Sequence, residues 1–167
     1  YARWIEGFAG SGKSVLLIHA LQEYALKNPK NKVCVVVFTH ALIDLLQSGI
    51  SPDLKDSIKV MTYLNFVDKD KENYDLVVVD EVQDVPAKVL EKIKKKKKKM
   101  IVGGDDAQSI YKYGSRGKQI EEVLNPARLK LPMVYRLTRK IIKIVKTILP
   151  EGVMVSATSG GMEEIQV

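Results

Sequence analysis

Eight consecutive residues near the start of the chain have the pattern of a phosphate-binding loop. The stretch G-F-A-G-S-G-K-S follows G-x-x-x-x-G-K-[ST], between a strand-like run and a helical run. Its glycines let successive backbone N–H groups approach an anion at the positive end of the following helix. The residues expected to hold the phosphates of ATP are Gly7, Phe8, Ala9, Gly10, Ser11, Gly12, Lys13 and Ser14.

Two residues of this loop have side chains with a chemical role. Lys13 is expected to reach the β- and γ-phosphates, and the Ser14 hydroxyl is expected to ligate Mg²⁺. The alternative is a glycine-rich turn that binds nothing.

A second reactive stretch, Y-D-L-V-V-V-D-E-V-Q-D, covers residues 74–84. It is an apolar strand that ends in two adjacent acids, and neighbouring side chains on a strand point in different directions. Asp80 is therefore expected to hold Mg²⁺, directly or through water, while Glu81 polarises the attacking water as general base. The alternative is an acidic strand-to-loop exit without chemistry.

Strand-like and helix-like segments alternate along the chain and would position these residues. Strands are expected at 2–6, 33–38, 58–60, 76–79, 100–102 and 127–131, and helices at 13–26, 41–47, from 86 onward, at 118–124 and at 138–149. This order predicts an α/β domain with a parallel sheet, helices on both faces and a site at the carboxyl ends of the strands.

The formal net charge of +7 owes six of its charges to one lysine run at 94–99. The rest of the chain is nearly neutral, so the overall basicity is weak support for a nucleic-acid partner. We expect the run to be a solvated extension of the preceding helix and the turn after it. Contact with a phosphate backbone is the alternative.

The single cysteine, Cys34, lies in an apolar run and is expected to be a buried strand residue. The chain has no apolar stretch near eighteen residues, which indicates no membrane partner. Together these features predict a soluble protein of a reducing compartment, the cytoplasm.

Several motifs resemble one family of motors. D-E-V-Q-D at 80–84 and G-D-D-A-Q-S-I-Y at 104–111 are similar to motifs II and III of superfamily 1 helicases of the UvrD/Rep/PcrA type. V-F-T-H at 37–40, M-T-Y at 61–63 and V-Y-R at 134–136 resemble further motifs in the same order. The resemblance implies a RecA-like P-loop NTPase domain, the first motor domain of an ATP-dependent DNA helicase in a compact version.

By this resemblance Gln108 contacts the γ-phosphate and couples its state to the nucleic-acid track, and Arg136 reaches the same phosphate. The track is single-stranded DNA, with RNA not excluded, and aromatic faces suit it because they stack bases without regard to sequence. The residues assigned to it are Phe38, Thr39, His40, Thr62, Tyr63, Tyr111 and Tyr113. Core packing is the alternative for Phe38 and Tyr63.

The chain also departs from the family pattern. His40 and Val134 stand where asparagine is usual, and residues 112–117 carry extra positions. Motifs V and VI are absent, so residues 1–150 are interpreted as one motor domain and 151–167 as the start of a second one or a C-terminal strand. Because translocation needs two domains that close on ATP, the chain alone is expected to hydrolyse ATP very slowly.

Two other functions fit the same residues. One is a nucleotide-gated switch in which ATP controls a protein partner and no strand is tracked. The other is an inactive module that serves as a scaffold. The aromatic set at the strand ends favours the motor over the switch.

Overall fold

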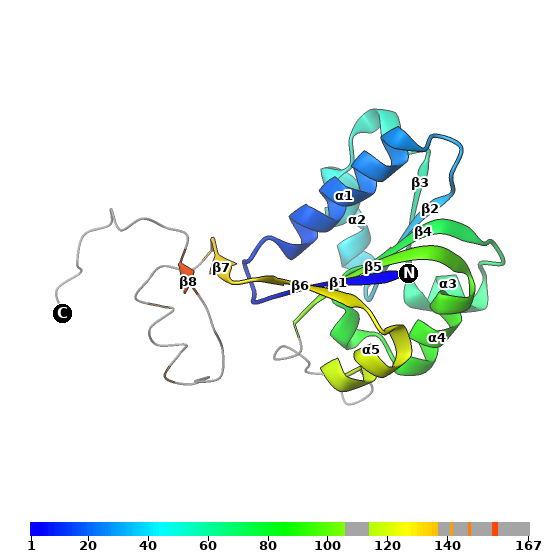
Figure 1. The fold of residues 1–167 in the computed structure, drawn as a ribbon. Helices are drawn as coiled ribbons and strands as arrows, with labels where there is room; N and C mark the ends of the chain where they lie inside the picture. Colours follow the sequence, from blue (N-terminus) through cyan, green and yellow to red (C-terminus); the bar gives the residue numbers. More distant parts are fainter. Residues whose placement is uncertain (106–113, 137–140, 142–146, 148–154, 157–167) are drawn as a thin grey trace.

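The computed structural model describes residues 1–105, 114–136, 141, 147 and 155–156. A parallel sheet runs through this part of the chain in the strand order β3-β2-β4-β5-β1-β6 (Figure 1). Its strands are β1 (Ala2–Gly7), β2 (Val33–Val37), β3 (Ile58–Thr62), β4 (Tyr74–Val79), β5 (Lys97–Gly104) and β6 (Ala127–Leu131). A separate short pair joins β7 (Met133–Val134) to β8 (Val155–Ser156).

Helices cover both faces of the sheet, as predicted (Figure 1). One face carries α1 (Lys13–Lys27) and α2 (His40–Gly49), and the other carries α3 (Tyr63–Asp68), α4 (Ala87–Lys95) and α5 (Gly117–Leu124). Two short 3-10 helices, η1 (Pro52–Leu54) and η2 (Val82–Asp84), follow α2 and β4. The predicted α/β class, a RecA-like sheet with helices on both sides, is confirmed.

The central strands are apolar on both faces because both faces are covered. All five residues of β2 are buried, as are Leu76 to Val79 of β4. Continuous valine-rich runs of this kind are typical of parallel strands, whose crossover helices exclude water from each side.

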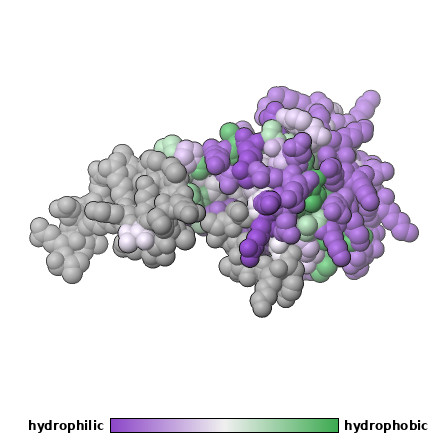
Figure 2. All heavy atoms as spheres, turned by 60° about the horizontal axis from the view of Figure 1, so that its bottom comes forward, coloured by the Kyte–Doolittle hydropathy of each residue, from purple (hydrophilic) through white to green (hydrophobic). Residues whose placement is uncertain are grey.

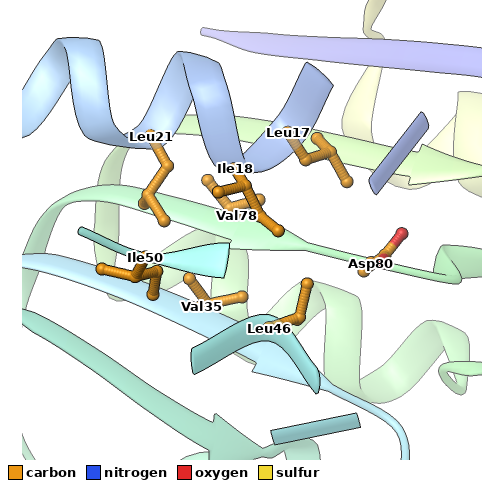
Figure 3. A pocket seen from close by; sticks show the side chains of 8 residues that line it. All are labelled: Leu17, Ile18, Leu21, Val35, Leu46, Ile50, Val78 and Asp80. Atoms are coloured by element: carbon orange, nitrogen blue, oxygen red, sulfur yellow. The ribbon is translucent and has the colours of Figure 1, made fainter. Parts of the chain in front are cut away.

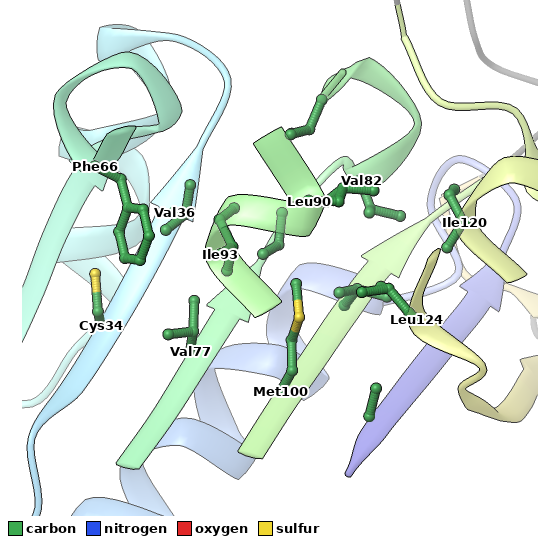
Figure 4. Packing of buried hydrophobic residues seen from close by; sticks show 14 of the residues in the cluster. Cys34, Val36, Phe66, Val77, Val82, Leu90, Ile93, Met100, Ile120 and Leu124 are labelled. Carbon is green, nitrogen blue, oxygen red and sulfur yellow. The ribbon is translucent and has the colours of Figure 1, made fainter. Parts of the chain in front are cut away.

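The two faces have separate cores. Figure 4 shows Cys34, Phe66 and Met100 packed between the sheet and the α3–α5 layer, and all three are fully buried. On the opposite face, Leu17 and Leu21 of α1 pack against the sheet. Cys34 is thus the buried strand residue that the sequence predicts.

The lysine run does not adopt the structure predicted for it. Helix α4 ends at Lys95 and β5 already begins at Lys97, so half of the run is strand. The register of β4 explains this, because Tyr74 lies opposite Lys97 and the Tyr74 N–H donates to the Lys96 carbonyl at 2.8 Å. Backbone pairing with a central strand outweighs the preference of lysine for helix and solvent.

Helix α3 is an element that the hydrophobic pattern did not reveal. Thr62 caps it by accepting a hydrogen bond of 3.3 Å from the Asn65 N–H, and Phe66 anchors it in the core. A threonine followed by a short amphipathic turn is the signal that could have located it. The helix predicted at 138–149 and the domain boundary at 150 lie outside the described residues for the most part.

Candidate functional site

The phosphate loop joins the end of β1 to the start of α1 and depends on two left-handed glycines. Gly10 has a φ of 78° and Gly12 a φ of 87°, a region that other residues enter only with strain. Gly12 caps the helix, and its carbonyl accepts the Leu16 N–H at 2.9 Å. The loop therefore presents the N-terminus of α1 at the carboxyl edge of the sheet, where an anion is favoured.

Lys13 is buried and folds back over this loop. Its ammonium group donates hydrogen bonds to the Gly7 carbonyl at 2.7 Å and the Phe8 carbonyl at 3.2 Å. The Ser11 hydroxyl is also buried, and within the described part of the chain it has no hydrogen-bond partner. The loop thus concentrates donors that a phosphate could accept from.

Asp80 lies directly opposite the end of the loop. The Ser14 hydroxyl donates to Asp80 Oδ2 at 2.7 Å, although the two residues are 66 positions apart in the sequence. Asp80 is 3% exposed, and burial raises the pKa of its carboxyl, partly offset by the Ser14 hydrogen bond. The structure therefore brings together the two residues expected to bind Mg²⁺.

The surroundings of Asp80 explain this shift of its pKa. A cavity of about 10 Å³ lies under α1, and Figure 3 shows Asp80 as the polar residue at one end of an otherwise apolar lining. The lining side chains are Leu17, Ile18, Leu21, Val35, Leu46, Ile50 and Val78. An apolar wall on one side of a carboxylate favours its neutral form unless a cation is supplied from the other side.

Glu81 is held in a defined orientation by Gln83. Glu81 has a left-handed φ of 49°, and the Gln83 amide donates to Glu81 Oε2 at 2.8 Å. The oxygen of the same amide accepts the Asp105 N–H at 3.2 Å. Gln83 is 2% exposed, and a Cβ on Gly104 would lie 2.4 Å from its amide oxygen. One buried amide therefore links the expected base to the end of β5.

Gln83 is the functional candidate that sequence reasoning missed. From the sequence, this glutamine is only one letter of the helicase-like motif D-E-V-Q-D, with no role of its own. The signal that could have found Gln83 is its position two residues after Glu81. A short 3-10 turn between them brings the Gln83 side chain back to the Glu81 carboxylate.

Asp84 closes the same turn. Its Oδ1 atom is buried and, among the described residues, has no hydrogen-bond partner. Burial, followed by repulsion from Glu81, raises its pKa to about 6.

The segment that follows β6 and β7 lies against the phosphate loop. The Tyr135 N–H donates to the Gly10 carbonyl at 2.9 Å, and a Cβ on Gly10 would lie 2.5 Å from the Arg136 Cβ. The Arg136 side chain is exposed, and its backbone lies next to the phosphate loop whose γ-phosphate it is expected to reach. Gln108 lies outside the described residues.

A cavity of about 380 Å³ opens beside the loop, lined by Glu6, Gly7, Phe8, Asp105, Lys130, Leu131 and Pro132.

The residues assigned to the nucleic-acid track fall at the carboxyl ends of β2 and β3. Phe38 and Tyr63 stack on each other with ring centroids 5.4 Å apart and planes 14° apart, and both are half-buried. Thr39 and His40 are exposed at the start of α2. Thr62 is buried and its hydroxyl caps α3, as described above.

Tyr111 and Tyr113, the other two track candidates, lie outside the described residues. Across the described ranges, no group of three histidine, cysteine or acidic side chains could hold a metal ion, and no helix is long and apolar enough to span a membrane.

The Schlafen group 3, DNA/RNA helicase domain family matches residues 3–142. The chain belongs to this family. Its matched segment includes the phosphate loop, the two acids that follow β4 and the segment after β6 that lies against the loop. No match to a curated protein sequence was found.

Solved helicase structures share the fold of this Schlafen-type domain. Arterivirus nonstructural protein 10, a helicase solved with DNA, is 18% identical with a TM-score of 0.65 over 98% of this chain and 46% of its own. The UvsW helicase of bacteriophage T4 is 19% identical with a TM-score of 0.56, over 77% and 54% of the two chains. Pif1 helicase is 16% identical with a TM-score of 0.54, over 92% and 45%. The chain thus spans about half the length of these helicases.

Proposed function

We propose that this domain is the first motor domain of a helicase or translocase that works like the UvrD/Rep/PcrA type, binding ATP·Mg²⁺ and part of a single-stranded DNA track. The observation that carries the proposal is the 2.7 Å hydrogen bond between Ser14 and Asp80. It joins the end of a glycine loop to the acid of a neighbouring strand, which is the arrangement that a metal–triphosphate needs.

Lys13 would provide the first electrostatic contact. Its ammonium group now donates to two loop carbonyls, Gly7 and Phe8. Phosphate oxygens are charged acceptors and therefore stronger partners than these neutral carbonyls. Lys13 is expected to turn from the carbonyls to the β- and γ-phosphates, while the loop N–H groups bind the remaining oxygens.

Ser14 and Asp80 would hold Mg²⁺. The fit rests on two oxygen donors that are already in contact, and oxygen ligands are what Mg²⁺ prefers. A bound Mg²⁺ would neutralise charge on the phosphates. Asp80 supports this role because burial raises the pKa of its carboxyl, and a bound cation favours the ionised form.

Glu81 would act on the attacking water. Its carboxylate is oriented by the Gln83 amide, so the oxygen that is not engaged by Gln83 is free to accept the proton of a water. Arg136 is proposed to reach the γ-phosphate, since its backbone already packs against Gly10. Gln108 is proposed to sense the same phosphate.

The stacked pair of Phe38 and Tyr63 would support bases of the track. Their rings are already parallel, and a base could continue the stack for roughly 1–3 kcal/mol. Thr39 and His40, exposed beside them, are proposed to contact the backbone, with Thr62 acting through its cap of α3. The DNA complex of the arterivirus helicase supports a nucleic-acid partner for this fold.

A second motor domain in the same parent protein is part of the proposal, because the chain spans only about half of the helicases that it resembles. Closure of two domains on ATP would complete the site, so slow hydrolysis is expected of this chain alone. The buried, unpaired thiol of Cys34 suits a reducing cytoplasm.

Nucleotide binding tests the site directly. A fluorescent ATP analogue titrated with and without Mg²⁺ should bind the unmodified chain and not Lys13→Ala. Lys27→Ala is the control, since Lys27 lies exposed in the last turn of the same helix. Equal affinity of Lys13→Ala and the control would remove the loop from the proposed function.

A second measurement distinguishes the motor domain from the nucleotide-gated switch. Single-stranded DNA binding is compared with and without nucleotide for the unmodified chain, Phe38→Ala and Tyr63→Ala. A motor domain should lose affinity in both variants and respond to nucleotide. Binding of ATP without any nucleotide-dependent DNA affinity would favour a switch that acts on a protein partner.

A further inference from the structure

The amino-terminal edge of the sheet, opposite the phosphate loop, is strongly cationic. Residues 88–99 contain eight lysines and one carboxylate, Glu91. The last turn of α4 and the start of β5 bring Lys92 and the six lysines of residues 94–99 to one edge, whereas Lys88 lies in the first turn of α4. Figure 2 shows mainly hydrophilic side chains at the right-hand end of the molecule, where the strands begin.

Few of these charges are neutralised by neighbouring side chains. Lys98 pairs with Asp75 at 2.7 Å and, over the described part of the chain, is the only lysine of residues 88–99 with a carboxylate partner. Lys94 donates to the Val123 carbonyl at 2.7 Å and Lys96 to the Phe66 carbonyl at 3.3 Å. Carbonyl contacts fix those side chains but leave their positive charge uncompensated.

An aromatic ring and a second basic segment adjoin the run. Lys99 lies with its ammonium 5.0 Å from the centre of the Tyr24 ring, and the Tyr24 hydroxyl accepts a hydrogen bond of 2.9 Å from Asn31. The loop that contains Asn31 also carries the exposed Lys30. We define the amino-edge surface by Tyr24, Lys30, Lys95, Lys97 and Lys99.

We propose that the amino-edge surface binds the phosphate backbone of a nucleic-acid strand, at a site separate from the aromatic pair at the opposite edge. Closely spaced lysines favour a polyanion because each phosphate contact releases a condensed counterion. Tyr24 holds the Lys99 ammonium group at this surface through a cation–π contact. The helicase family of the chain favours nucleic acid over an acidic protein segment.

A lipid surface is a poorer match for the same residues. Membrane-bound amphipathic helices insert an apolar face beneath their basic one. The apolar side of α4 is packed in the core, with Leu90 and Ile93 fully buried, so the outward side of the helix carries charged residues, its lysines and Glu91.

Binding at this surface should not depend on nucleotide. In a parallel sheet the amino and carboxyl ends of the strands lie at opposite edges, and a six-residue strand such as β4 separates them by about 20 Å. The surface therefore does not require the chain to bind or hydrolyse ATP.

The test is the salt dependence of oligonucleotide binding. A triple variant, Lys95→Gln, Lys97→Gln and Lys99→Gln, is compared with the unmodified 167-residue chain by fluorescence anisotropy. The probes are a single-stranded DNA and a single-stranded RNA of the same sequence, measured between 50 and 300 mM salt, each with and without the ATP analogue. Two controls are the same three positions changed to Arg, and the pair Lys88→Gln with Lys118→Gln on the exposed surface elsewhere.

The Gln variant should lose at least tenfold in affinity at low salt, and the slope of log affinity against log salt should fall by about 0.7 for each phosphate contact removed. The loss should be equal with and without nucleotide, and the Arg variant should retain binding. An unchanged slope and affinity in the Gln variant would overturn the proposal. So would an equal loss per charge in the Lys88 and Lys118 control.

Discussion

Gln83 donates a hydrogen bond of 2.8 Å to Glu81, and the two side chains are held together by a single turn of 3-10 helix. The other end of the Gln83 amide accepts the Asp105 N–H at the exit of β5. The orientation of the expected general base is therefore tied to the strand that leads into the G-D-D-A-Q stretch. This link gives a test of how the base is positioned.

Replacing Gln83 by Leu should impair hydrolysis without removing ATP binding. The Glu81 carboxylate would lose its fixed orientation, and a positioned base contributes roughly 10²–10⁴-fold to rate, so a loss of at least tenfold is expected. Single-turnover cleavage of ATP by excess protein gives the rate, and the fluorescent analogue gives the affinity. Gln47→Leu, an exposed glutamine on α2, is the control.

Glu81→Gln should abolish cleavage in the same assay and leave affinity intact. A Gln83→Leu variant that hydrolyses ATP at the normal rate would show that Glu81 needs no support from the amide. A variant that loses affinity as much as rate would point to a general disturbance of the site.

Removing the Ser14 hydroxyl should reduce both stability and the effect of Mg²⁺. The buried Asp80 carboxylate would lose a hydrogen-bond donor, which costs about 1–3 kcal/mol of unfolding free energy. The increase in ATP affinity on adding Mg²⁺ should shrink in Ser14→Ala, as measured by analogue titration with and without the metal. Ser57→Ala, in an exposed loop, should change neither quantity. An undiminished Mg²⁺ effect in Ser14→Ala would exclude Ser14 as a ligand.

The parallel sheet and the meeting of the phosphate loop with the acids after β4 were predictable, because each depended on a local sequence pattern. The glycine loop, the valine-rich strands and the acids after β4 specify burial and strand ends, and a parallel sheet brings strand ends to one edge. The contact between Ser14 and Asp80 follows from that geometry. The family resemblance at the level of a helicase domain rested on motifs in their chain order.

Other features depend on contacts between distant segments. The strand structure of Lys97 comes from its register against Tyr74, which no local preference of lysine encodes. The role of Gln83 depends on a turn that returns its amide to Glu81 and on the close approach of Gly104. The contact of Gly10 with Arg136 joins positions more than a hundred residues apart.

Asp84 predicts a pH dependence of stability. Its pKa is raised from an ordinary 3.8 to about 6, chiefly by burial, so the folded chain keeps this proton over a range where the unfolded chain has lost it. Unfolding then releases a proton, and the contribution of Asp84 to stability falls as pH rises from about 4 to about 6 and stays low above that. Asp84→Asn should therefore raise the melting temperature at pH 7 relative to the unmodified chain.

The difference between the variant and the unmodified chain should be smallest at pH 4, where the folded chain keeps Asp84 protonated and uncharged, as asparagine is. Melting temperatures between pH 4 and pH 8 measure the effect, with the exposed Asp44→Asn on α2 as the control. A difference between Asp84→Asn and the unmodified chain that is the same at pH 4 and pH 7 would assign it to packing and not to charge.

Alanine substitutions at two glycines of the phosphate loop distinguish the cost of backbone strain from the cost of steric crowding. Gly10 and Gly12 both have positive φ, so alanine at either position should cost about 1–2 kcal/mol of unfolding free energy. A Cβ at Gly12 would meet nothing within 4 Å, whereas one at Gly10 would lie 2.5 Å from the Arg136 Cβ. Gly10→Ala should therefore be the more destabilising of the two in urea denaturation, because the segment after β6 must move away from the loop. Adding Arg136→Gly should recover the difference in Gly10→Ala and none of the loss in Gly12→Ala; equal recovery in both would mean that the 133–136 segment does not press on the loop.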